Sequence, residues 1–167
     1  MTQFPIMGVI EDRIAQLGLV LPAPVSAPGG VRLPFRQVRV VGTIAYVAGH
    51  GPLAADGTLV EPGGKVGAEV TLDDAYGAAR LTGLAMLSSL SRALGDLDRI
   101  AAWGRVFGMV NVAPGFDRMP EVINGFSDLI LEVFGPETGA HARSAVGQAA
   151  LPFGIPVEIE AEVHLRA

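Results

Sequence analysis

Residues 157–165 alternate strictly between apolar and polar side chains, and this pattern restricts the fold of the chain more than any other. The segment reads VEIEAEVHL, with Glu158, Glu160, Glu162 and His164 on one parity and apolar residues on the other. Alternate residues of a β-strand point to the same face of a sheet. The segment therefore predicts a strand with one apolar face and one acidic face.

Three carboxylates on one face of a strand lie at intervals of about 6.7 Å and repel one another. At an effective dielectric of 20, neighbouring charges at this distance cost about 2.5 kcal/mol. Two interpretations remain open at this point. The strand could be a solvated edge whose charges discourage aggregation, or it could lie on a partly buried surface where cations pair with the glutamates.

The bulk properties of the chain predict one domain spanning residues 1–167, with residues 1–30 forming an N-terminal helix and an extended connector. Cysteine is absent, which excludes disulfides, thiolate nucleophiles and thiolate metal sites. The three histidines show no paired spacing, so we expect no metal site. We also expect no cofactor.

The charge and hydropathy of the chain restrict its partners and its location. The net charge of −5 gives no basic footprint for nucleic acid, so none is expected as a partner. No apolar run reaches about 18 residues, and no basic region precedes an apolar stretch at the N-terminus. We therefore expect no membrane association and a cytoplasmic location.

Helix and turn signals divide the rest of the chain into elements. The predicted order is a short helix, two strands, a helix, a strand, a helix and two strands, which describes an α+β sheet with two main helices on one face. The predicted helices cover residues 9–19, 72–94 and 120–135, and the predicted strands cover 36–41, 43–48, 99–112, 143–151 and 157–165.

Several residues mark the ends and the packing of these elements. Thr71 and Asp74 form a capping-box-like start for the first long helix, and Gly95 suits its left-handed end. Pro120 fits the first turn of the second long helix. Gly83 is expected to let the first long helix approach the sheet closely.

Two strands are apolar on both parities, which is unusual for a sheet covered by helices on one side only. Tyr46 and Phe107 have apolar neighbours of both parities, such as Val47 and Val106. The second face should then be covered by other subunits, so we predict an obligate oligomer.

The closing segment HARSAVGQAALPFGIPVEIEAEV, residues 141–163, resembles the signature of the reactive-intermediate deaminase (Rid, formerly YjgF) superfamily. YVAGHGPL resembles the family's Ser-Gly-Gln strand end, and the segments of both long helices are similar to those of the family. Including the N-terminal helix, the chain resembles a longer branch of the superfamily. The resemblance implies a chorismate-mutase-like fold with a mixed six-stranded sheet, and a homotrimer with ligand clefts between subunits.

The resemblance also implies an activity and residues to perform it. Members of the best-understood branch of the family hydrolyse enamines and imines such as 2-aminoacrylate and 2-iminopropionate, releasing ammonia and a 2-oxo acid. Arg143 matches the arginine that holds the substrate carboxylate, and Glu158 matches the glutamate that positions the attacking water; both are our predicted catalytic residues. The predicted substrate-binding positions are Phe35, Ala48, Gly49, His50, Asn124 and Ala145.

The match departs from the family pattern at three of these positions. Phe35 replaces a tyrosine, Ala48 a serine and His50 a glutamine, so the cleft is expected to be more apolar and to hold a different or larger ligand. His50 is either a proton carrier or a loop or interface residue. Asn124 either contacts the ligand or caps a nearby loop.

Other predictions concern the remaining charges and the rival functions. Glu160 and Glu162 are expected to form structural ion pairs with Arg36, Arg39, Arg105 or Lys65, and no serine nucleophile is indicated near Ser127 or Ser144. The alternatives to an imine hydrolase are a non-catalytic module that binds a small carboxylate-bearing metabolite and, less favoured by the acidic charge, an endoribonuclease.

Overall fold

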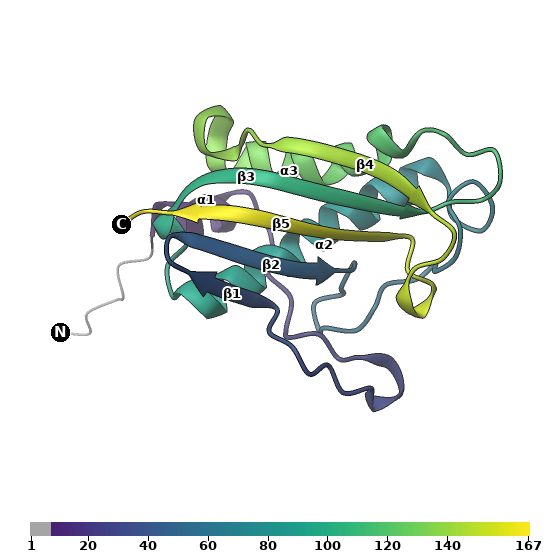
Figure 1. Ribbon diagram of the computed structural model, residues 1–167, viewed down its shortest axis with the longest axis horizontal. Coiled ribbons are helices and arrows are strands. Elements are labelled where there is room, and N and C mark those ends of the chain that lie inside the picture. Colours follow the sequence, from purple (N-terminus) through teal and green to yellow (C-terminus); the bar gives the residue numbers. More distant parts are fainter. Residues whose placement is uncertain (1–7) are drawn as a thin grey trace.

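Five strands form one mixed sheet in the computed structural model, which describes residues 8–167 (Figure 1). The strand order is β1-β2-β5-β3-β4, with β3 and β4 parallel and the other neighbours antiparallel. The strands are β1 (Val38–Val41), β2 (Ile44–His50), β3 (Ile100–Asn111), β4 (Ala142–Gln148) and β5 (Val157–Leu165).

The five strands predicted from the residue pattern are confirmed, but the six strands implied by the family resemblance are not. In the described part of the chain, the long segment between β2 and α2 makes only isolated bridges, such as Leu53 with Leu59 and Val66 with Val112. This segment contains Pro52, Pro62 and several glycines. Proline cannot donate a ladder hydrogen bond and glycine weakens a strand, so a continuous sixth strand does not form.

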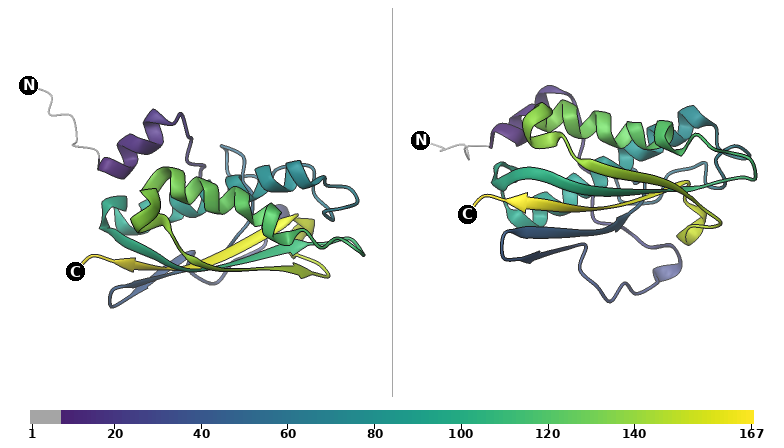
Figure 2. Two further views of the ribbon diagram at one scale, coloured as in Figure 1. Left: turned by 90° about the horizontal axis from the view of Figure 1, so that it is seen from above. Right: turned by 45° about the horizontal axis from the view of Figure 1, so that its top comes forward.

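Two long helices cover one face of this sheet, as predicted. They are α2 (Leu72–Leu94) and α3 (Met119–Gly139), while α1 (Val9–Gln16) contacts α3 on its outer side (Figure 2). The predicted helix signals hold: Thr71 accepts a hydrogen bond from the Asp74 N–H at 3.1 Å, and Gly95 has a φ of 77°. In α3 the regular helix is interrupted at Gly135, just before Pro136.

The N-terminal helix is capped by a carboxylate from a distant part of the chain. Asp98, in the short turn η2 (Leu97–Arg99), accepts hydrogen bonds from the N–H groups of Val9 and Ile10 at 2.7 and 3.0 Å. Glu11 in turn accepts from the N–H of Leu97 at 2.8 Å. These reciprocal bonds satisfy helix-terminal donors and fasten α1 to the turn that leads into β3.

Close contact between the two long helices requires glycine at two positions. A methyl group added at Gly83 would lie 2.6 Å from Leu129 Cδ2, so this glycine allows α2 to approach α3, not the sheet as we predicted. A methyl group at Gly125 would overlap the backbone carbonyl of Tyr76 in α2. At this crossing the α2 backbone at Gly83 therefore meets a side chain of α3, and the α3 backbone at Gly125 meets the backbone of α2.

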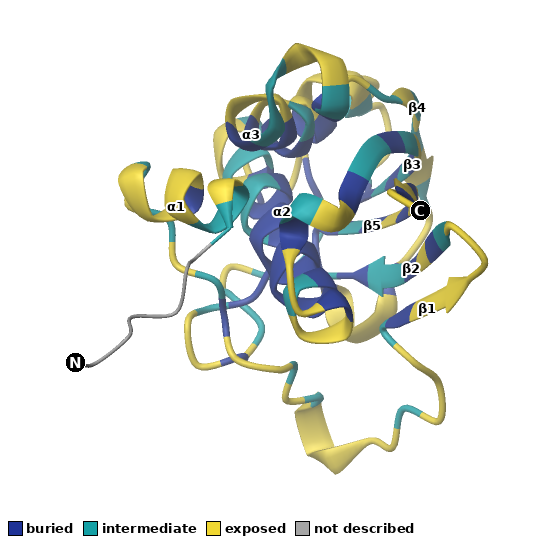
Figure 3. Cartoon of the chain, turned by 90° about the vertical axis from the view of Figure 1, so that its left-hand side faces the viewer, coloured by how far each residue is buried: buried dark blue, intermediate teal, exposed yellow. Residues whose placement is uncertain are grey.

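The two faces of the sheet differ in what covers them. Trp103, Val106 and Ile159 are buried beneath the helices, where Trp103 and Phe126 pack edge to face with ring centroids 5.8 Å apart. Figure 3 shows α2 as the most deeply buried element and β1 as largely exposed. Within residues 8–167 no helix covers the opposite face, which presents Arg39, Tyr46, Ala48, Arg105, Phe107, Met109, Ser144, Val146, Glu158, Glu160 and Glu162.

The crossing of α2 and α3 generates a paired prediction. Gly125→Ala should lower the free energy of unfolding by about 1–3 kcal/mol, because the new methyl group meets rigid backbone. Gly77→Ala, in α2 with open space around it, should raise the free energy of unfolding by up to about 1 kcal/mol through helix propensity. Urea unfolding of both variants checks this, and equal effects at the two positions would contradict the packing described.

Candidate functional site

A β-bulge near the end of β2 determines which way the residues of the Gly-His segment point. Val47 pairs with Ala161 and His50 pairs with Ile159, so the bulged strand has one extra residue between these pairs. The irregularity turns His50 to the helix side of the sheet, where only 6% of its surface is exposed. Without the bulge the strict alternation of the strand would place His50 on the open face.

The same bulge brings Gly49 against the carboxylate of Glu158 on the neighbouring strand β5. A methyl group added at Gly49 would overlap Glu158 Oε1. Glycine is therefore required here because the carboxylate occupies the space of a side chain. Gly49 and Glu158, which were predicted separately as site residues, are therefore adjacent in the structure.

His50 is held by a hydrogen-bonded chain that fixes its tautomer. Its Nδ1 lies 2.6 Å from the carbonyl oxygen of Ala48, an acceptor, so Nδ1 carries the proton. Its Nε2 then accepts from the Ser89 hydroxyl at 2.8 Å, and Arg92 donates to the same hydroxyl at 3.2 Å. Burial lowers the pKa of His50, and the backbone bond only partly offsets it.

The hydrogen bonds of His50 indicate a structural role within this chain. Both ring nitrogens are already bonded, and the ring is buried beside α2. His50 pins the bulge that positions Gly49. A role as a proton carrier or as an interface residue stays a prediction.

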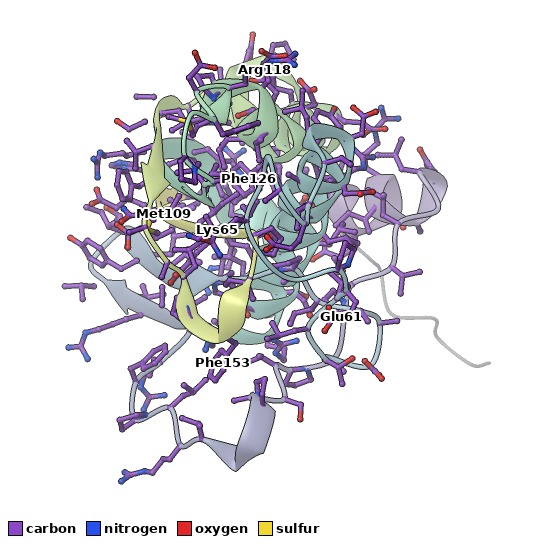
Figure 4. All side chains as sticks on the ribbon, turned by 90° about the vertical axis from the view of Figure 1, so that its right-hand side faces the viewer. Glu61, Lys65, Met109, Arg118, Phe126 and Phe153 are labelled. Atoms are coloured by element: carbon purple, nitrogen blue, oxygen red, sulfur yellow. The ribbon has the colours of Figure 1, made fainter. Side chains whose placement is uncertain are left out.

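A cavity of about 280 Å³ lies beside Gly49 and Glu158. Phe35, Gly49, His50 and Glu158, four of the eight predicted site residues, line it together. Its remaining walls come from the connector before β1, the loop after β2 and the turn η3 (Pro152–Gly154), and consist of Val25, Leu33, Gln37, Gly51, Leu53, Leu59, Pro152, Phe153 and Ile155. Figure 4 labels Phe153 at this turn.

Glu158 is the one ionisable carboxylate that lines this cavity in the described part of the chain. Burial, and to a smaller extent repulsion from Glu160, raise the pKa of Glu158. No hydrogen-bond donor contributes to its environment. A partly dehydrated carboxylate with free lone pairs is suited to hold a water molecule and to accept a proton from it.

Arg143 lies elsewhere in the same chain, on the helix side of the sheet. It pairs with Val106, a buried residue, and donates hydrogen bonds to Asn124 Oδ1 and Ser127 Oγ, both at 3.0 Å, and to the Pro120 carbonyl at 3.2 Å. Glu158 pairs with Met109 on the opposite face. One subunit therefore does not bring Arg143 and Glu158 together.

The other predicted positions divide between these two places and the open face of the sheet. Asn124 contacts Arg143, and Ala145 lies two residues further along β4 on the same face. Ala48 lines a second hollow of about 270 Å³ on the open face. Its backbone carbonyl still supports the His50 ring.

We predicted structural ion pairs between Glu160 or Glu162 of β5 and nearby cations. None forms within residues 8–167 of one chain. Arg36, Arg39 and Arg105 line the same hollow as Glu160 and Glu162, but the ion pairs present within residues 8–167 are Arg80 with Glu132 and Arg118 with Glu121. Lys65 instead donates to Asn111 Oδ1, at 3.0 Å, and to the carbonyls of Val112 and Ala149. Arg105 lies over the Phe107 ring instead, with its Cζ 5.8 Å from the ring centroid.

A serine and a histidine meet next to Arg143, which sequence analysis did not anticipate. Ser127 Oγ lies 2.9 Å from His141 Nε2, and His141 Nδ1 lies 2.7 Å from the Gly139 carbonyl. Because Arg143 donates to the same hydroxyl, the arrangement repeats the Arg92–Ser89–His50 chain. No carboxylate orients His141, so the pair serves here to hold Arg143 and lacks the third group of a hydrolytic triad.

Carboxylates close enough together to hold a metal ion occur at one place within residues 8–167, formed by Glu11, Asp96 and Asp98. Glu11 and Asp98 already accept the backbone hydrogen bonds that fasten α1. None of the described helices is both long and apolar enough to cross a membrane.

Comparisons with known proteins agree with this architecture. Residues 11–157 match the family described as "YjgF/chorismate_mutase-like, putative endoribonuclease". Protein TCP17 of Trypanosoma cruzi is 40% identical over 142 residues, covering 81% of this chain and 89% of that protein. The fold and the matched residues place the chain in the YjgF/Rid superfamily, as the sequence motifs predicted.

Two bacterial relatives with solved structures are similar to this chain in both sequence and fold. Atu1372 of Agrobacterium tumefaciens, described as of unknown function, is 38% identical with a TM-score of 0.82, covering 95% of this chain and 94% of that one. A Shewanella oneidensis protein described as a "putative endoribonuclease" is 31% identical with a TM-score of 0.84, covering 93% of this chain and 99% of that one. The chorismate-mutase-like fold is thereby confirmed.

The raised pKa of Glu158 predicts that its ionised carboxylate lowers the stability of the folded protein at neutral pH. Folding favours the protonated carboxyl, so this contribution to stability is present at low pH and is lost as pH rises through the raised folded-state pKa. Glu158→Gln should therefore raise the melting temperature at pH 7, with a gain that shrinks toward pH 4.

Calorimetric melting across this pH range checks the prediction. Glu137→Gln, which changes an exposed glutamate on α3, is the control and should show no such gain. A Glu158→Gln protein that melts below the unmodified protein at neutral pH would show that the carboxylate is not destabilised by its site.

Proposed function

We propose that the protein hydrolyses 2-imino or 2-enamino acids to 2-oxo acids and ammonia at clefts between identical subunits. The observation that carries this proposal is the Glu158 carboxylate, partly buried, without a hydrogen-bond donor and with a raised pKa, at the edge of an apolar cavity. Family membership supports the same reaction class.

The proposed reaction uses Glu158 as a general base. A water molecule held by the carboxylate loses a proton to it while its oxygen forms a bond to the iminium carbon. Glu158 then returns this proton to the nitrogen of the resulting amino alcohol, which leaves as ammonia, and the C–OH gives up its proton to solvent as it becomes the carbonyl of a 2-oxo acid. An enamine first takes a proton on carbon to give the same iminium ion.

Arg143 anchors the substrate carboxylate in this proposal, but from a neighbouring subunit. Its Nη1 donates to Asn124 and Ser127 and its Nη2 donates to the Pro120 carbonyl, which leaves the Nε–H and one Nη2 N–H for a ligand. A planar guanidinium donates two parallel hydrogen bonds to a carboxylate and keeps its proton at every relevant pH. Since one subunit places Arg143 and Glu158 on opposite faces of the sheet, a second copy must supply one of them.

The uncovered face of the sheet supports the homotrimer that we propose as the working assembly. Tyr46, Phe107 and Met109 lie on it among arginines and glutamates that lack partners at ion-pair distance within residues 8–167. Figure 4 shows Met109 on this face, away from Phe126 in the core. Packing such faces together buries apolar surface and brings charges of opposite sign into reach.

A non-catalytic binding module is the second candidate, favoured by one observation. Phe35 provides no hydroxyl, and both nitrogens of His50 are already bonded, so among the described residues that line the cavity Glu158 is the group left to exchange a proton. Such a site could retain a small carboxylate without turning it over. The endoribonuclease names of relatives suggest a third activity, against which the net charge of −5 and a cavity of about 280 Å³ both argue.

Loss and recovery of activity test the proposed cleft. Arg143→Ala and Glu158→Gln should each lower ammonia release from freshly generated 2-iminopropionate by at least about 10²-fold, as expected for loss of a general base or of substrate positioning. Arg118→Ala, an exposed arginine that pairs only with Glu121, is the control and should retain activity.

Coexpression of the two inactive variants then tests whether one site combines residues from two subunits. If Arg143 and Glu158 of one site come from different subunits, random mixed trimers should regain about a quarter of the activity, because one neighbouring pair in four combines both intact residues. Mixed assemblies without activity would contradict the intersubunit cleft. RNA cleavage that persists in Arg143→Ala would indicate a contaminating nuclease, and carboxylate binding without ammonia release would favour the binding module.

The pH dependence of the reaction should report the repulsion between Glu158 and Glu160. A general base must be ionised, so activity should rise with pH through the raised pKa of Glu158. Glu160→Gln removes the charge repulsion that contributes to the raised pKa of Glu158, so the rising limb of the rate profile should move to lower pH. Rate profiles of kcat/KM against pH measure the shift, and an unchanged limb would exclude Glu158 as the titrating base.

A further inference from the structure

The walls of the cavity beside Glu158 are apolar and come from parts of the chain outside the catalytic strands. The connector between α1 and β1 contributes Val25, Leu33 and Phe35, and the turn η3 contributes Phe153 on the facing wall. Phe35 and Phe153 remain 54% and 51% exposed. Two half-exposed phenylalanines at one cavity present apolar surface that a ligand can remove from water.

Hydrogen bonds hold the connector wall at both ends, at residues 22–26 and at Gln37, whose carbonyl accepts from the Ala48 N–H at 2.9 Å. The N–H groups of Ala23 and Ser26 donate to the carbonyls of Ala55 and Gly57, each at 2.9 Å, and the Ser88 hydroxyl in α2 donates to the Pro22 carbonyl at 2.6 Å. These bonds tie the connector both to the loop after β2 and to the helix layer. The wall is therefore a built part of the site.

The facing wall includes a residue in an unfavourable backbone conformation. Phe153 has a φ of 57° and is the one non-glycine residue with positive φ within residues 8–167. A bulky side chain is strained in this region, where glycine is favoured. Strained residues gather at ligand sites, and here the conformation holds an aromatic ring at the cavity.

We propose that this cavity receives a large apolar substrate side chain, branched aliphatic or aromatic, so that the preferred substrates are the 2-imino acids of this class. This inference rests on the proposed function and names its substrate class. A second carboxylate inside the cavity would face Glu158, so the substrate's acid group must point toward the opening. A polar side chain would lose hydration against walls that offer it few partners.

The size of the space agrees with this assignment. A cavity of about 280 Å³ approaches the lower end of the roughly 300–1,000 Å³ typical of ligand pockets, so it exceeds what the methyl group of 2-iminopropionate fills. A methyl group would leave Phe35 and Phe153 in contact with water. An isobutyl or benzyl group covers them.

Competition between substrates tests the proposal. Imines generated in place by an amino-acid oxidase from leucine, phenylalanine and alanine are offered to the purified full-length protein, and ammonia release gives kcat/KM. The leucine- and phenylalanine-derived imines should exceed the alanine-derived imine by at least about tenfold, since each methylene in an apolar pocket contributes a factor of 10 or more. Equal values for all three would overturn the proposal.

Variants of the two walls locate the preference. Phe35→Ala and Phe153→Gly should each lower the ratio of leucine- to alanine-derived kcat/KM, whereas Leu131→Ala, an exposed apolar residue on α3, should leave it unchanged. Phe153→Gly suits a positive φ, so its melting temperature should equal or exceed that of the unmodified protein. A ratio unaffected by both wall variants would overturn the assignment of the cavity.

Binding of stable product analogues separates this inference from the proposed activity. Calorimetric titration with phenylpyruvate and 4-methyl-2-oxopentanoate should give tighter binding than pyruvate, by at least about tenfold. This discrimination without any ammonia release would refute the hydrolase and uphold the substrate-class inference. Hydrolysis of all the imines, together with equal affinity for the three oxo acids, would uphold the hydrolase and refute the substrate-class inference. The absence of both binding and turnover would overturn both hypotheses.

Discussion

The contact between Gly49 and the Glu158 carboxylate is the constraint around which the candidate site is organised. The carboxylate can stand there only because β2 lacks a side chain at that position, and β2 presents that position only because its bulge is held by His50. The bulge in turn depends on Ser89 and Arg92 of α2. The helix layer thus determines the position of a carboxylate on the far side of the sheet, through a buried and neutral imidazole.

The second organising feature is the division of charged groups between the two faces of the sheet. Arg143 lies on the helix side with Asn124 and Ser127, while the glutamates of β5 lie on the uncovered side. Within one chain, hydrogen bonds and ion pairs satisfy each set of charged groups only in part. An assembly that places the edge of one sheet beside the cavity of another resolves this imbalance, which is why the proposed chemistry and the proposed trimer are one hypothesis.

Much of the fold follows from local patterns, and the site follows only in part. The alternation of β5, the Thr71 cap and the end of α2 at Gly95 were predicted correctly because each depends on a few neighbouring residues. The predicted end of the second long helix at Gly135 is wrong, since α3 continues past an interruption there to Gly139. Gly83 was assigned to the wrong neighbour because a sequence shows that space is needed without showing which element uses it.

The roles of single side chains depended on contacts between distant segments. His50 could not be assigned from its sequence neighbours, since its partner Ser89 lies 39 residues away and the bulge that reverses its direction leaves no clear signal. Ser127 and His141 likewise meet only through the return of β4 along α3. Phe153 is different: a Pro-Phe-Gly turn between two strands marks a tight bend, and that signal could have directed attention to its ring.

The cap that Asp98 provides for α1 has a consequence for how such a protein diversifies. It fixes the beginning of a segment whose other end enters β1, and the connector between them forms one wall of the cavity. Connector residues such as Leu33 and Phe35 line this wall on a part of the chain separate from β2 and β5, which carry the glycine and the carboxylate. New ligand preferences can therefore arise in the part of the chain least involved in the chemistry, while the reacting group is inherited intact.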